Sequence, residues 1–183
     1  MKVFKQSLLL LAVVVVGTLA GCSTASTKAA DVSDSVRASL DKAGYKDVSV
    51  SQDRDKGVVT LGGHVAADSD KAQAESIAKS LAGTQVVSNE IAVVPPGAES
   101  DDAKKVNSDL DKGIESNLHA ALITAKLEKS VKYTVKNHVV TLTGEVNSQS
   151  KRSQAEEVAS GVLNVQQVVN ELQVKSQKAT SSN

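Results

Sequence analysis

Basic side chains gather in one stretch of a chain whose overall charge is balanced. The sequence has 21 Lys and Arg against 21 Asp and Glu, which argues against a general nucleic-acid binder, because such a protein displaces counterions with many basic residues. Anionic lipid headgroups would gain about 1 kcal/mol from each lysine near a membrane surface. The alternative is a solvated basic face without a ligand. The candidate site consists of Lys126, Lys129, Lys132, Lys136, Lys151 and Arg152.

The other residues that could do chemistry form no recognisable catalytic or metal site. His64, His119 and His138 are scattered along the chain, with no second ligand at the spacing that zinc sites use. The sequence shows no nucleophile with a base and an orienting group, and no glycine loop that would cradle phosphates. We therefore predict a protein that is not an enzyme and that takes no cofactor or metal.

The single cysteine, Cys22, follows a segment typical of secretion signals. Two lysines precede an apolar run over residues 8–16, which is short for a membrane span. Residues 19–22, Leu-Ala-Gly-Cys, resemble the lipobox of bacterial lipoproteins. That resemblance implies a signal peptide over residues 1–21 and a Cys22 that carries acyl chains such as palmitate, and more than one chain gives stable anchoring. The alternatives are an ordinary signal peptide with a chance cysteine, or an uncleaved anchor.

The residues after Cys22 bear on where the protein is anchored. Ser23 in place of Asp resembles the signal for outer-membrane delivery, so we expect the periplasmic face of the outer membrane rather than the inner membrane. Small and polar residues without apolar positions complete residues 22–30, as in a flexible tether.

The rest of the chain is organised around a repeat. Shifted forward by 81 residues, residues 58–93 align without a gap on residues 139–174. Two copies at this long period indicate paired domains and not a solenoid. The identical positions include Val58, Val59, Thr60, Leu61, Gly63, Asn89 and Glu90. We predict a first domain over 31–93, a Pro/Gly linker over 94–100, a second domain over 101–174 and a disordered tail over 175–183.

Apolar spacing predicts the order helix, strand, strand, helix, strand in each domain. In the first, a helix over 31–43 precedes strands over 48–51 and 58–61. A second helix, capped by Asp68 or Ser69, leads to a strand over 87–93. The sequence thus predicts an α+β class.

The second domain repeats this order with a longer first helix, over residues 101–126. Its apolar residues keep an unbroken spacing of four. Apolar side chains left exposed on this helix would favour a protein partner over a lipid. The apolar residues at the spacing of four are Val106, Leu110, Ile114, Leu118 and Leu122.

Two further pairs of residues recur in both copies. Gly63 and Gly144 follow the hairpin strands, where glycine indicates a bulge or a close backbone approach. Asn89 and Asn170 fall in register with inward valines, so we expect their amides to make structural hydrogen bonds.

Taken together, the strand Val-Val-Thr-Leu-x-Gly-x-Val, an Ala-rich helix and the strand Val-x-Asn-Glu-Leu-x-Val resemble the BON domain. The pattern lies at 58–65 with 87–93, and again at 139–146 with 168–174. The resemblance covers about residues 31–93 and 110–174. It implies a three-stranded mixed sheet with two helices on one face, in two tandem domains.

The resemblance also implies a role in the bacterial envelope. BON proteins are described as phospholipid-interacting modules of osmotic-stress and outer-membrane-maintenance proteins, and dual-BON lipoproteins share this layout. We therefore expect a lipid-anchored periplasmic protein that binds anionic phospholipid and supports envelope integrity. The alternative is an adaptor that presents its two modules to envelope proteins or cell-wall machinery.

Overall fold

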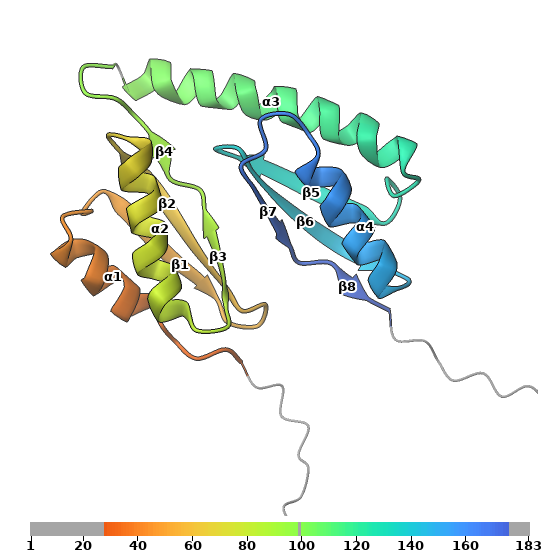
Figure 1. Ribbon diagram of the computed structural model, residues 1–183, viewed down its shortest axis with the longest axis horizontal. Helices are drawn as coiled ribbons and strands as arrows, with labels where there is room; N and C mark the ends of the chain where they lie inside the picture. Colours follow the sequence, from red (N-terminus) through yellow and green to blue (C-terminus); the bar gives the residue numbers. More distant parts are fainter. Residues whose placement is uncertain (1–27, 99, 176–183) are drawn as a thin grey trace, which may run out of the picture.

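The computed structural model describes residues 28–98 and 100–175 (Figure 1). The predicted signal peptide, Cys22, most of the tether and residues 176–183 lie outside this range. The first domain comprises α1 (Ser33–Lys42), β1 (Val48–Asp53), β2 (Val58–Val65), α2 (Asp68–Ala82), β3 (Val86–Asn89) and β4 (Ala92–Val93). The second comprises α3 (Ser100–Thr124), β5 (Val131–Lys136), β6 (Val139–Val146), α4 (Gln149–Ser160), β7 (Gln167–Asn170) and β8 (Gln173–Val174).

Each domain is a mixed sheet whose central strand is the second one. β1 pairs with β2 in an antiparallel hairpin, and β3 and β4 both pair with β2 in parallel. The second domain repeats this topology with β5, β6, β7 and β8. The two helices of each domain cover one face of its sheet (Figure 1). The predicted α+β fold is therefore confirmed.

The expectation of one continuous third strand over 87–93 is wrong, because Asn89 interrupts it. The Asn89 side-chain oxygen accepts a hydrogen bond from Ile91 N at 3.4 Å. Its nitrogen donates to the Lys71 carbonyl at 3.1 Å and to the Glu75 carboxylate at 3.0 Å. The amide thus fastens the strand break to α2.

Asn170 makes the same contacts in the second domain. It donates to the Arg152 carbonyl at 3.1 Å and to the Glu156 carboxylate at 2.9 Å, and accepts from Leu172 N at 3.2 Å. Each of these four residues lies 81 positions beyond its counterpart in the first domain, so that Arg152 takes the place of Lys71 and Leu172 that of Ile91. The predicted structural role of both asparagines is confirmed.

Each domain has its own core of aliphatic side chains between helices and sheet. Val36, Leu40 and Leu61 are fully buried in the first, and Leu118 and Leu142 in the second. One tyrosine packs beside each core, Tyr45 in the first domain and Tyr133 in the second. The two cores are separate clusters, so each domain buries its apolar surface largely by itself.

The predicted cap of α2 is wrong. Ala67 occupies the N-cap in an extended conformation and makes no side-chain capping bond, while Asp68 is already the first helical residue. Asp68 and Asp70 still lie in the first turn, where negative charge complements the helix dipole. In α4 a side-chain cap does form, from Ser148.

The long helix of the second domain is confirmed, but only part of it packs in the core. Ile114, Leu118 and Leu122 are buried, whereas Val106 is 59% exposed and Leu110 is 38% exposed. The N-terminal half of α3 extends past the second sheet toward the first domain (Figure 1). No helix within the described residues has the length and apolarity needed to span a membrane.

Candidate functional site

Three of the six predicted basic residues lie close together in the chain at one end of the second domain. Lys126 and Lys129 belong to the connection between α3 and β5, and Lys132 lies on β5, exposed beside the half-buried Tyr133. Among residues 28–98 and 100–175, no carboxylate forms an ion pair with these three lysines. We call Lys126, Lys129 and Lys132 the basic cluster.

Lys136 lies apart from the basic cluster, at the hairpin end of β5. It lies four positions further along the strand than Lys132, which corresponds to about 13 Å. Its ammonium group pairs with the Glu90 carboxylate of the first domain at 3.0 Å, and the Glu90 side chain is only 15% exposed. The charge of Lys136 is therefore engaged within the protein.

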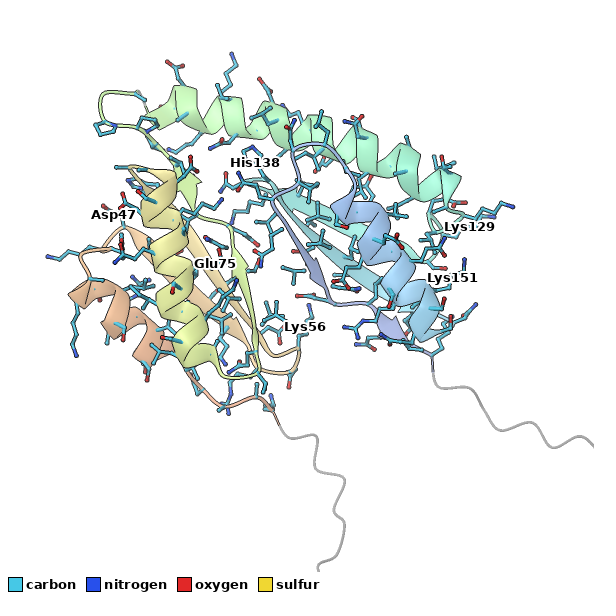
Figure 2. All side chains as sticks on the ribbon, viewed as in Figure 1. Asp47, Lys56, Glu75, Lys129, His138 and Lys151 are labelled. Atoms are coloured by element: carbon cyan, nitrogen blue, oxygen red, sulfur yellow. The ribbon has the colours of Figure 1, made fainter. Side chains whose placement is uncertain are left out.

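The two basic residues of α4 also differ from each other. Lys151 is exposed in the first helical turn, and its ammonium group donates to the Gln154 side chain at 3.0 Å. The half-buried Arg152 donates to the Asn170 carbonyl at 3.0 Å, which joins α4 to β7. Lys151 and Lys129 both lie at the end of the second domain away from the hairpin turn (Figure 2). The predicted site thus divides into exposed lysines at one end of the domain and two residues that bond within the protein, the exposed Lys136 and the half-buried Arg152.

The two predicted structural glycines lie where one backbone passes close to another. Gly63 has a φ of 86° and Gly144 a φ of 116°. A Cβ atom on Gly63 would overlap the Asp47 carbonyl oxygen, and one on Gly144 would overlap the Ser130 carbonyl oxygen. The conformation and the close approach both support the backbone interpretation of these glycines.

An open groove of about 740 Å³ lies between the two domains and beneath the N-terminal half of α3. Ala92, Val94 and Val135 contribute apolar surface to it, and lysines and carboxylates also line it. The other lining residues are Gly63, His64, Glu90, Lys104, Ser108, Asp111, Lys112, Glu115, Lys136 and Asn137.

Asp111 on α3 holds the hairpin that forms one wall of this groove. Its carboxylate accepts hydrogen bonds from Asn137 N at 2.8 Å and from His138 N at 2.9 Å. Both turn residues have positive φ angles, 47° and 68°. Asp111 was not among the predicted residues, although its place three residues before the core residue Ile114 indicates a side chain on the inward side of the helix.

The surroundings shift the pKa values of several titratable groups at the domain interface. Hydrogen bonding to the Glu171 carboxylate, at 2.7 Å, raises the pKa of Lys56 despite partial burial. Burial lowers the pKa of Lys71, whose ammonium group donates to the Gln166 side chain at 3.0 Å. Burial acts to raise the pKa of Glu75, but hydrogen bonds from Lys79 and Asn89 outweigh it and leave that pKa lowered.

A metal site would need several ligands in one place. Within the part of the chain that the structure describes, no three His, Cys, Asp or Glu side chains are grouped so that they could hold an ion.

Comparison with known proteins supports the repeat and the fold of its units. The BON domain family matches residues 28–95 and residues 110–176. The chain is 32% identical over 143 residues to Osmotically-inducible protein Y of Escherichia coli (strain K12), covering 76% of this chain and 69% of the relative.

Two solved structures of CdsD, a structural protein of the type III secretion system of Chlamydia trachomatis, also align with this chain. Both have a TM-score of 0.33, at 13% and 12% identity, and they cover 76% and 78% of this chain. The chain spans 62% and 60% of those two chains.

Two family matches therefore coincide with the two structural domains, and the relative spans both. The resemblance that the strand and helix motifs indicate is confirmed: this chain belongs to the BON-domain family.

Proposed function

We propose that this protein is a non-enzymatic envelope protein, anchored by acyl chains on Cys22, whose second domain binds anionic phospholipid. It supports the integrity of the outer membrane or envelope under stress, from the periplasmic face of the outer membrane. The lipobox-like residues 19–22 support the anchor. The name of the Escherichia coli relative, Osmotically-inducible protein Y, supports a role under osmotic stress.

The observation that carries the proposal is the basic cluster. Its three lysines are exposed, and no ion pair within the described residues neutralises them. Lysines near an anionic membrane contribute about 1 kcal/mol each, so three contribute about 3 kcal/mol. That free energy corresponds to roughly a hundredfold in affinity. Because the attraction is electrostatic, salt weakens it over a Debye length of about 8 Å at physiological ionic strength.

Binding to liposomes tests the proposal. The fragment 23–183 lacks the acylated cysteine and contains every residue of the two domains. We expect it to sediment with liposomes that contain phosphatidylglycerol and not with purely zwitterionic ones. Replacing Lys126, Lys129 and Lys132 by Gln should weaken this binding roughly a hundredfold.

A matched control removes the same charge elsewhere. Lys42, Lys46 and Lys105 are exposed and lie in the first domain or on the N-terminal half of α3. Their triple replacement by Gln should leave most of the binding intact. Equal losses in the two triple variants would mean that net charge alone attracts the protein, and would contradict a site at the basic cluster.

A second candidate function is that of a protein-interaction adaptor. The specific observation in its favour is the exposed apolar surface of α3, where Val106 and Leu110 lie one helical turn apart. A photo-crosslinking amino acid at either position should give an adduct of defined mass in the envelope if a protein covers them. The same amino acid at the exposed Ser116 serves as the control.

A further inference from the structure

The two domains contact each other through equivalent residues, and the same kind of contact is made once in each direction. The first hairpin reaches the second strand break, where Lys56 pairs with Glu171 at 2.7 Å. The second hairpin reaches the first strand break, where the Asn137 side chain donates to the Glu90 carbonyl at 2.7 Å. Lys56 and Asn137 are equivalent at the 81-residue shift, as are Glu90 and Glu171. Each contact is therefore the counterpart of the other with the domains exchanged.

The arrangement of the two hairpins agrees with this exchange. Figure 2 shows Lys56 and His138, from the turns of the two hairpins, at opposite ends of the region between the domains. The edge strands β3 and β7 contact each other between these ends. Two domains related by a local twofold axis would place their hairpins in this way.

The centre of the interface obeys the same relation. Val58 and Val139 are equivalent residues, and both are buried in one small apolar cluster with Val169. Ser88, the counterpart of Val169, is also buried. These side chains belong to the sheet faces that the helices leave free. Equivalent residues that meet each other mark the position of a twofold axis.

Some contacts have no counterpart. Lys136 pairs with Glu90 and Lys71 donates to Gln166, each at 3.0 Å, but within the described residues no bond joins the equivalent pairs, Asp55 with Glu171 and Arg152 with Gln85. The Gln167 side chain donates to the Val87 carbonyl at 2.6 Å and accepts from Asn89 N at 2.9 Å, so it covers the free edge of β3. The equivalent residue in the first domain is Val86, which cannot make these bonds and is 46% exposed. The interface is thus an approximately twofold contact between two similar modules, with asymmetric additions at Gln167, Lys136 and Lys71.

We propose that this interface forms between chains as well as within one: the first domain of one copy pairs with the second domain of another, giving a closed twofold dimer. Because the exchange is reciprocal, each first domain meets a second domain and no interface surface is left unpaired, so the dimer closes and all the contacts described above are kept. Only the connection between β4 and α3, which contains Pro95 and Pro96, changes its path. The partner that the surface fits is therefore a second copy of this chain.

Zero-length cross-linking tests the proposal on the natural sequence. Equal amounts of unlabelled and nitrogen-15-labelled fragment 23–183 are unfolded together, refolded at high concentration and treated with a carbodiimide. This reagent joins an ammonium group to a carboxylate that it already contacts, as Lys56 contacts Glu171 and Lys136 contacts Glu90. Mass spectrometry then shows whether the two joined peptides carry the same label.

We expect mixed-label cross-links at both pairs, and their share should rise with protein concentration during refolding. In the dimer fraction the share should approach half, the statistical limit for an equal mixture. The Lys79–Glu75 pair within α2 is the internal control, because a pair within one helix must carry a single label.

Two results would overturn the proposal. Cross-links of a single label at both interface pairs would mean that the interface forms only within one chain. Mixed labels at one pair alone would mean that copies associate without the closed twofold exchange.

Discussion

Gly63 and Gly144 allow a quantitative test of how the two hairpins are built. Replacement of Gly63 by Ala places a Cβ against the Asp47 carbonyl oxygen. That carbonyl accepts a hydrogen bond from His64 N at 3.3 Å, so it cannot move away without breaking a bond at the start of the hairpin. A non-glycine residue in a left-handed conformation costs about 1–2 kcal/mol, and we expect the overlap to raise the total to about 3 kcal/mol, within the range for strained backbone.

The expected change in thermal stability is large. For a domain of this size each kcal/mol shifts the midpoint by about 4–8 °C, so Gly63→Ala should lower it by roughly 12–24 °C. Gly144→Ala should act in the same direction, because its Cβ meets Ser130. The measurement is thermal unfolding of fragment 23–183 followed by circular dichroism.

Two other glycines separate the cost of the left-handed backbone from the cost of the close approach. Gly44 has a φ of 94° but open space around its Cβ position, so Gly44→Ala isolates the left-handed backbone cost. Gly113 lies in α3 with nothing near its Cβ position, and Gly113→Ala should stabilise by about 0.5–1 kcal/mol. If Gly63→Ala destabilises no more than Gly44→Ala, the argument from close approach is refuted.

Three further predictions concern polar contacts. Folding lowers the pKa of Glu75, so its carboxylate stabilises the fold above its unfolded pKa of about 4.3. This contribution is lost as the pH falls through the lower folded pKa. Acid unfolding should therefore show a smaller pH dependence in Glu75→Gln than in the natural sequence. Asp111→Ala leaves the Asn137 amide without its acceptor and should cost about 1–3 kcal/mol in urea unfolding. Gln167→Ala uncovers the β3 edge, and hydrogen exchange at the Asn89 amide should become faster; an unchanged rate would contradict the bridging role.

The parts of the fold that follow local rules could be predicted from the sequence. Within the described residues, apolar periodicity places the four helices and both hairpins, because each element packs one face on its own core. The hydrogen-bonded amides of the buried Asn89 and the half-buried Asn170 were predictable for the same reason, since their positions fall among inward valines. The strand break that these amides create was not, because it depends on contacts with a helix distant in sequence.

The interface between the domains is reflected in the sequence of the two central strands, but apolar periodicity alone does not identify it. The consecutive valines at 58–59 and 139–140 are all buried, and an apolar run without alternation indicates a strand covered on both faces. What covers the second face cannot be derived from spacing, because it is the other domain. The same limit applies to α3, where an unbroken spacing of four continues into the exposed Val106 and Leu110.

The division of the basic residues likewise depends on tertiary contacts. Lys132 and Lys136 share one face of β5, as their alternation with Tyr133 predicts. Their surroundings nevertheless differ, because Glu90 from the other domain reaches Lys136.

One tyrosine beside each core gives each domain its own optical reporter. The chain has two tyrosines and no tryptophan, so no brighter residue masks their emission. Burial raises the pKa of both Tyr45 and Tyr133, and each phenol therefore signals the opening of its own domain by ionising more readily. With Tyr45→Phe or Tyr133→Phe, spectroscopy can follow one half of the molecule at a time and show whether the halves unfold in one step or in two.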